Sequence, residues 1–87
     1  MKTGSLIFSK VTAEKIRQLR RGKDYSQQFM ADSLGISQNA YSKLESGKTP
    51  INLDRLCEVS QLLDIDAQEL LQEAFALVGH AGKQIST

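Results

Sequence analysis

Apolar residues recur at intervals of three or four positions in five separate segments of the chain, with Gly or Pro residues between most of these segments. This spacing is typical of helices that bury one face, and no segment alternates between apolar and polar residues long enough to indicate a strand. The pattern therefore predicts an all-α, five-helix fold with helices at about residues 12–21, 26–34, 37–46, 53–63 and 66–78.

A very short turn joins the second and third predicted helices. Ser26 and Ser37 stand directly before these helices, where a serine hydroxyl can accept a free backbone N–H of the first turn. Gly35 and Gly47 follow them, and glycine ends helices well because it adopts left-handed geometry at little cost. These residues predict two short helices at a sharp angle, with Ile36 filling the corner between them.

The chain length of 87 residues fits one domain, which we expect to span residues 11–78. Residues 1–10 are expected to form a separate N-terminal leader. We expect a flexible tail over residues 79–87, because Gly79 and Gly82 end the apolar periodicity.

The fourth predicted helix has a core stripe whose members are three or four residues apart, namely Leu53, Leu56, Val59 and Leu63. Cys57 lies beside this stripe and is expected to be a small buried apolar residue. One cysteine cannot form a disulfide within the chain, which suits a reducing cytoplasm.

Charge is unevenly distributed along the chain. Residues 1–50 hold nine Lys or Arg and four Asp or Glu residues, whereas residues 51–87 hold two and six. A basic end and an acidic end would orient the molecule toward a polyanion such as nucleic acid. Neither a signal peptide nor a membrane-spanning segment is evident, so we expect a cytoplasmic protein with no membrane partner.

Few residues are suited to catalysis or metal binding. His80 is the only histidine, it lies in the expected tail, and no second ligand stands near it. No serine lies in a nucleophile-elbow pattern. We therefore expect no enzyme activity, no metal and no cofactor.

The first turn of the third predicted helix carries Gln38 and Asn39. Each side-chain amide has a donor and an acceptor on one planar group, which can pair with N6 and N7 of adenine. Ser42 and Lys43 follow one turn later on the same face. Helix-turn-helix proteins place this end of the second helix of the motif against base edges in the major groove.

Several elements across residues 12–72 resemble the helix-turn-helix of the phage repressor/Cro superfamily, also called the XRE family. Each element alone is common, but their occurrence in this order and spacing is specific. The matching positions are Ile16, Arg17, Leu19, Arg20, Ser26, Gln27, Met30, Ala31, Leu34, Gly35, Ile36, Ser37, Gln38, Leu44, Glu45, Gly47, Lys48 and the segment from Leu53 to Leu63.

The resemblance implies a role for each matched polar residue. Gln27 would bond a DNA phosphate and brace the side chain of Gln38, which would contact a base. Arg20 and Glu45 would form a structural ion pair between the first and third helices. The residues expected to contact DNA are Arg17, Gln27, Gln28, Ser37, Gln38, Asn39, Ser42, Lys43 and Lys48.

Three positions depart from the commonest family pattern. Asp24 and Asp64 stand where glycine is frequent, and aspartate tolerates left-handed geometry moderately well. Phe29 occupies a position that is often charged, and we expect it to pack on Tyr41 or on residues 6–8 of the leader. The second and third helices are otherwise intact.

The fifth predicted helix has more apolar residues than one buried face needs. They are Leu70, Leu71, Ala74, Phe75, Leu77 and Val78. Either the domain buries the whole helix or a second chain covers the excess, and we favour the second explanation. The expected homodimer interface consists of Leu71, Phe75 and Val78.

Together these features predict a sequence-specific transcriptional regulator, a repressor, that binds an inverted repeat in double-stranded DNA as a homodimer. Such a protein would associate with the nucleoid when bound to DNA. Two alternatives stay open: the antitoxin of a toxin–antitoxin pair, and a protein-interaction module of the same fold. Gln38, Asn39 and Lys43 argue against the module, because that alternative fits acidic residues better in the first turn of the third helix.

Overall fold

The computed structural model describes the backbone of residues 2–82 and the side chains of residues 9–76. Its helices are α1 (Lys2–Gly22), α2 (Gln27–Leu34), α3 (Gln38–Glu45), α4 (Leu53–Leu62) and α5 (Ala67–Gly82). Residues 2–82 contain these five helices and no strand, which confirms the predicted all-α fold.

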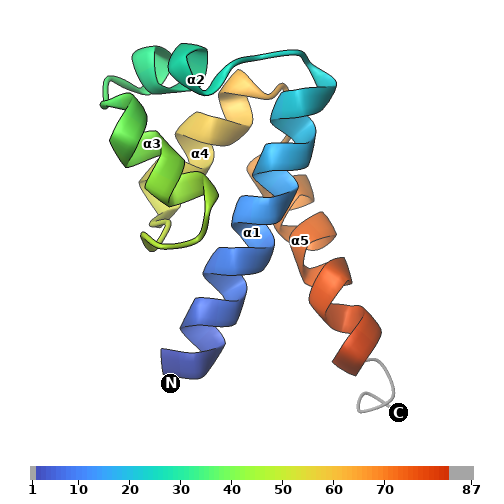
Figure 1. The fold of residues 1–87 in the computed structure, drawn as a ribbon. Helices are drawn as coiled ribbons and strands as arrows, with labels where there is room; N and C mark the ends of the chain where they lie inside the picture. The colour runs from blue at the N-terminus through green and yellow to red at the C-terminus, as the bar shows by residue number, and fades with distance from the viewer. Residues whose placement is uncertain (1, 83–87) are drawn as a thin grey trace.

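The helices surround one core in an arrangement that leaves α3 at an edge of the molecule. α1 packs along α5 and also contacts α3, while α4 contacts both α2 and α5. Figure 1 shows α2, α3 and α4 gathered on one side of α1, with the start of α1 and the end of α5 on the same side of the core.

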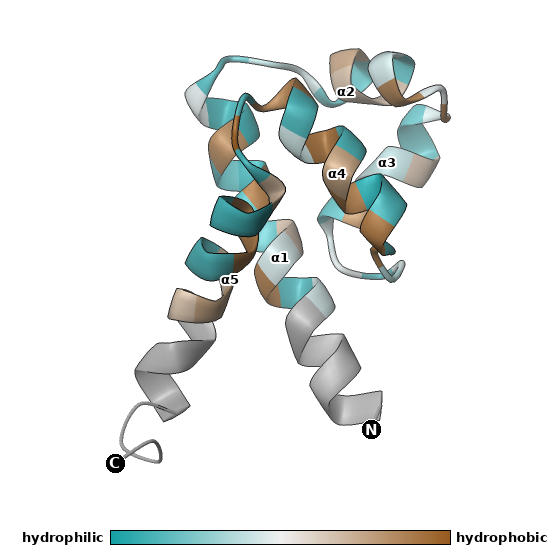
Figure 2. Cartoon of the chain, turned by 180° about the vertical axis from the view of Figure 1, so that it is seen from behind, coloured by the Kyte–Doolittle hydropathy of each residue, from teal (hydrophilic) through white to brown (hydrophobic). Residues whose placement is uncertain are grey.

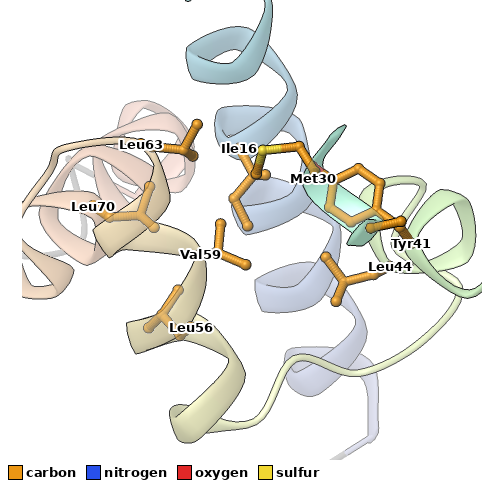
Figure 3. Close-up of a cluster of buried hydrophobic side chains, with 9 residues drawn as sticks. Ile16, Met30, Tyr41, Leu44, Leu56, Val59, Leu63 and Leu70 are labelled. Atoms are coloured by element: carbon orange, nitrogen blue, oxygen red, sulfur yellow. The ribbon is translucent and has the colours of Figure 1, made fainter. Parts of the chain in front are cut away.

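Each helix contributes at least one fully buried apolar side chain to this core (Figure 3). These side chains include Ile16, Met30, Tyr41, Val59 and Leu70. Burying a side chain of this size stabilises a fold by about 1.5–3 kcal/mol. The core therefore holds α3 in place through contacts shared by all five helices.

α1 begins at Lys2, so the predicted start of the first helix at residue 12 is wrong. The helix crosses the expected boundary between the leader and the domain without a break. Ser9, Thr12, Ala13 and Ile16 recur at helical spacing and are all buried. Because two of these four residues are polar, the apolar pattern does not reveal the part of the helix that precedes residue 12.

α5 continues beyond its predicted end and reaches Gly82. The helix passes through Gly79, which the sequence analysis took as the start of a tail. Residues 83–87 of that expected tail lie outside the described residues, and so do the side chains of residues 6–8 and of Val78.

Three of the four predicted stripe residues of α4 are buried, namely Leu56, Val59 and Leu63. The prediction was wrong for Leu53, which is 69% exposed because it is the first residue of α4 and lies one turn before the first buried residue of that helix, Leu56.

Cys57 was also expected to be buried and is exposed. Ser60 takes the buried position instead, and its hydroxyl donates to the carbonyl oxygen of Leu56 at 2.9 Å. The hydropathy colouring of Figure 2 shows this mixture along α4.

The three departures from the family pattern each have a structural explanation. Asp24 and Asp64 adopt the expected left-handed geometry, with φ of 61° and 56°. Phe29 packs on Tyr25, with 4.5 Å between ring centroids. No ring contact joins Phe29 to Tyr41 among the described residues, so the alternative that Phe29 packs on Tyr41 is wrong.

Candidate nucleic-acid interface

The tight turn between α2 and α3 is formed as predicted. Gly35 ends α2 with φ of 72°, and the N–H of Ile36 donates to the carbonyl oxygen of Ala31 at 3.0 Å. Ser37 then begins the next helix, where its hydroxyl accepts the N–H of Ala40 at 3.0 Å. These local bonds set the direction of α3 from its first residue.

α3 has one buried side and one exposed side. The buried residues are Tyr41, Leu44 and Glu45, Ser42 is half-buried, and the exposed residues are Gln38, Asn39, Ala40 and Lys43. Gln38 and Asn39 form no side-chain hydrogen bonds with the described residues. Their donors and acceptors are therefore available to a partner outside the chain.

Glu45 is only 3% exposed, and each oxygen of its carboxylate accepts two hydrogen bonds. Its Oε1 accepts from Nη2 of Arg20 and Nε2 of Gln27, both at 3.0 Å. Its Oε2 accepts from Nε of Arg20 at 2.7 Å and the hydroxyl of Tyr41 at 2.6 Å. The ion pair that the family resemblance implied is therefore present, and its bidentate geometry is the stronger kind.

The charges in this network follow from its hydrogen bonds. Burial alone would raise the pKa of Glu45, but the bonds from Arg20, Tyr41 and Gln27 outweigh burial and lower that pKa. The bond to Glu45 raises the pKa of Arg20. Burial and the neighbouring Glu45 raise the pKa of Tyr41. At neutral pH Arg20 and Glu45 are therefore charged and the hydroxyl of Tyr41 is neutral. This pair joins α1 to α3, and the bond from Gln27 adds α2.

The structure places Gln27, the first residue of α2, on this network. No hydrogen bond joins its side chain to that of Gln38 in the described part of the chain. A glutamine amide has two N–H donors and one carbonyl acceptor, and only one donor is used by Glu45. The other two groups remain free for a ligand or for Gln38.

Two other residues expected to contact DNA have partners within their own helices. Arg17 pairs with Glu14 in α1. Gln28 in α2 donates to Oδ1 of Asp32 at 2.8 Å. Surface contacts of this kind contribute only about 0.2–1 kcal/mol, so a phosphate could replace either of them at low cost.

The turn after α3 folds back on the end of that helix. The N–H groups of Lys48 and Thr49 donate to the carbonyl oxygen of Lys43, at 3.0 and 3.3 Å. Gly47 has φ of 79°, which permits this reversal. Lys48 is thereby held beside Lys43, and both residues are exposed.

Two of the hydrogen bonds to Glu45 were not predicted with the ion pair, namely those from Tyr41 and Gln27. The bond from Tyr41 had a signal, because Tyr41 lies one helical turn before Glu45 and a buried tyrosine hydroxyl usually has a partner. The bond from Gln27 had no such signal, because it depends on how α2 packs against α3.

The residues of the expected dimer interface differ in their exposure. Phe75 is 54% exposed, whereas Leu71 is half-buried and packs against the core of its own chain. Leu70 and Ala74 on the same helix are buried. Among the described side chains of α5, Phe75 therefore offers the largest apolar surface to a second chain.

Other kinds of site are not evident in the described part of the molecule. No cluster of three or more potential metal ligands occurs there, and none of the described helices has the length and apolar character needed to cross a bilayer. A hollow of about 250 Å³ lies between α2 and α4, lined by Ser33, Leu34, Glu58, Gln61 and Leu62. None of its lining residues belongs to α3.

Comparison with known proteins gives clear relatives for this arrangement. A helix-turn-helix family model matches residues 16–70. The SPbeta prophage-derived HTH-type transcriptional regulator YonR of Bacillus subtilis is 40% identical over 63 residues, which are 72% of this chain and 58% of YonR. The HTH-type transcriptional activator BcrR of Enterococcus faecalis is 41% identical over 58 residues, which are 67% of this chain and 28% of BcrR. The chain thus matches only part of the length of each relative.

A solved structure has the same fold. The clp gene regulator ClgR from C. glutamicum superimposes with a TM-score of 0.74 and 22% identity, covering 79% of this chain and 90% of that one. The family model includes all of α2, α3 and α4 and more than half of the chain. The protein therefore belongs to the XRE-type helix-turn-helix family.

Proposed function

We propose that this chain is a sequence-specific DNA-binding transcriptional regulator that places α3 in the major groove. The observation that carries the proposal is the exposed first turn of α3, where the amides of Gln38 and Asn39 have no partner among the described residues. An α-helix fits the major groove, and such amides can form paired hydrogen bonds with adenine. The names of YonR and BcrR, a transcriptional regulator and a transcriptional activator, support this function.

Gln27 connects the buried network to the proposed DNA contacts. One N–H of its amide stays on Glu45, the second is free to bond a phosphate, and the carbonyl oxygen can accept from Gln38. Each group of the amide would then have one partner. The hydrogen bond to Glu45 would hold Gln27 in place before DNA arrives.

The remaining contacts fall into two groups. Gln38 and Asn39 would contact base edges, and these contacts carry the sequence preference. The residues assigned to phosphates, or to the edges of the site, are Arg17, Gln28, Ser37, Ser42, Lys43 and Lys48. Phosphate contacts position the protein on the duplex without selecting a sequence.

The proposed active form is a homodimer that pairs α5 with its copy about a two-fold axis. Such pairing would cover Phe75 together with Leu71 and Val78. Two recognition helices would then lie about 34 Å apart, which matches an inverted repeat with one DNA turn between half-sites. The second half-site would raise the affinity through a high effective concentration.

Repression is the simplest consequence of such binding, because a dimer on an operator that overlaps a promoter blocks access to it. The protein would act in the cytoplasm and associate with the nucleoid when bound to DNA. Because the relative BcrR is named as an activator, repression needs its own test. A reporter gene with the selected site at its promoter shows whether the protein lowers or raises transcription. We expect expression to fall when the protein is present, and a rise would contradict repression.

DNA binding itself is tested by selecting bound sequences from random duplexes. Labelled selected and scrambled duplexes are then titrated at about 50 and 200 mM salt. We expect the selected duplex to bind more tightly and the affinity for both to fall steeply with salt. Equal affinity for the two duplexes, or no binding to either, would contradict the proposal.

The dimer is tested by sedimentation equilibrium at micromolar concentration. Phe75→Glu should give a monomer that binds the selected site weakly. Leu53→Glu is a matched control, because Leu53 is also an exposed apolar residue but lies on α4, outside the proposed interface. A monomeric parent chain, together with unchanged site binding by Phe75→Glu, would overturn the α5 interface.

A further inference from the structure

Lys10 lies directly against the turn that follows α3, although sequence analysis placed it in a separate leader. A Cβ at Gly47 would be 3.1 Å from Cα of Lys10 and 3.0 Å from its Cγ. Gly47 is buried, whereas Lys10 is exposed. The aliphatic stem of Lys10 therefore covers Gly47 while its ammonium group can extend into solvent.

This contact brings Lys10 close to Lys48. Consecutive Cα atoms are about 3.8 Å apart, so the spacing to Gly47 puts Cα of Lys10 within about 8–9 Å of Cα of Lys48. Lys48 is itself bonded through its N–H to the carbonyl oxygen of Lys43. Lys10, Lys43 and Lys48 thus form one basic cluster at the C-terminal end of α3.

The two other lysines whose side chains the structure describes, Lys15 and Lys23, have carboxylate partners. Lys15 pairs with Glu73 at 3.0 Å and Lys23 with Asp64 at 3.1 Å. No ion pair is formed by a member of the basic cluster within the described residues. These three lysines lie on neighbouring stretches of backbone and none is paired with a carboxylate among the described residues. They therefore give this surface a net positive charge that a polyanion would neutralise.

We propose that Lys10 binds a DNA phosphate and extends the interface from α3 onto the N-terminal half of α1. This inference rests on the proposed DNA-binding function. The contrasting explanation is that Lys10 only shields Gly47 and leaves its charge in solvent. The two explanations differ in the number of DNA counterions that binding releases, because each phosphate contact changes the salt dependence by a fixed amount.

The test uses Lys10→Met, which keeps an unbranched apolar stem over Gly47 and removes only the charge. Lys15→Met is the matched control, because it makes the same change on the same helix at a lysine already paired with Glu73. Dissociation constants for the selected and scrambled duplexes are measured between about 50 and 200 mM salt. Thermal unfolding of each variant shows that it is folded.

Affinity falls as salt rises, so the slope of log affinity against log salt is negative. We expect Lys10→Met to make this slope less steep by about 0.9. The fourfold rise in salt should then weaken this variant about 3.5-fold less than the parent chain. The loss should be similar on both duplexes, as expected of a phosphate contact. Lys15→Met and Lys10→Arg should keep the slope of the parent chain.

Two results would overturn the inference in distinguishable ways. If the parent chain binds specifically but Lys10→Met and Lys15→Met have equal slopes, Lys10 does not contact DNA and the proposed function stands. If the parent chain itself shows no specific binding that depends on salt, the proposed function fails and the inference fails with it.

Discussion

The two sides of α3 treat polar groups in opposite ways. On the buried side the carboxylate of Glu45 accepts four hydrogen bonds, one of them from the hydroxyl of Tyr41 on the same helix. On the exposed side the amides of Gln38 and Asn39 form none with the described residues. The eight residues of α3 thus divide into hydrogen-bonded groups that hold the helix and exposed groups that, under the proposed function, contact DNA.

The buried side is needed because α3 is too short to be stable alone. Isolated helices of fewer than about 12–15 residues are marginal in water. Core contacts of Tyr41 and Leu44, together with the Glu45 network, must therefore supply both the helix and its orientation. We therefore expect substitutions on the buried side to alter stability and substitutions on the exposed side to alter only DNA binding.

The largest effect is expected for Glu45→Ala. Removing the carboxylate leaves the guanidinium of Arg20 buried without its partner, which typically costs about 3–5 kcal/mol. Urea denaturation measures the loss in the free energy of unfolding. Glu58→Ala is the control, because Glu58 pairs with Arg55 on the surface and should cost less than about 1 kcal/mol. Equal losses for both variants would contradict the role given to the buried network.

Alanine substitutions at the two glycines that flank α3 should lower the free energy of unfolding by smaller and unequal amounts. Gly35 and Gly47 both have positive φ, which costs an alanine about 1–2 kcal/mol. A Cβ meets nothing at Gly35 but would press on the backbone of Lys10 at Gly47, which adds about 1–3 kcal/mol. The free energy of unfolding of Gly47→Ala should therefore fall further. Equal values for the two variants would show that the contact with α1 is not close.

The smallest effect is expected from pH. The pKa of Glu45 is lower in the folded chain than the value of about 4.3 in an unfolded one. Its contribution to stability is therefore complete above that value and is lost as pH falls through the folded pKa. The stability advantage of the parent chain over Glu45→Gln should shrink as pH is lowered below about 4.3, as measured by thermal unfolding. An advantage that grows on acidification would contradict the network.

The features that sequence predicted well are local ones. Ser26, Gly35 and Ser37 determine the α2–α3 turn through bonds within a few residues, and each behaves as predicted. The ion pair of Arg20 with Glu45 could be expected only through resemblance to a family, since the residues are 25 positions apart.

The features that sequence could not predict depend on packing between distant segments. The extent of α1 was missed because its buried face includes the polar residues Ser9 and Thr12, which look like surface in an apolar pattern. The contact of Lys10 with Gly47 follows from that extent and has no local signature. Gln27 was expected to contact a phosphate and Gln38, and its bond to Glu45 appears only when α2 and α3 are placed together.

The central claim is tested most directly by comparing Gln38→Ala with Lys48→Ala on a panel of single-base variants of the selected site. We predict that Gln38→Ala loses about 1–3 kcal/mol of binding energy on the preferred site and relaxes selectivity at one base position. Its free energy of unfolding should change by no more than about 0.5 kcal/mol. Lys48→Ala should weaken binding to every variant alike. Identical profiles for the two variants would contradict the assignment of base contact to the exposed turn of α3.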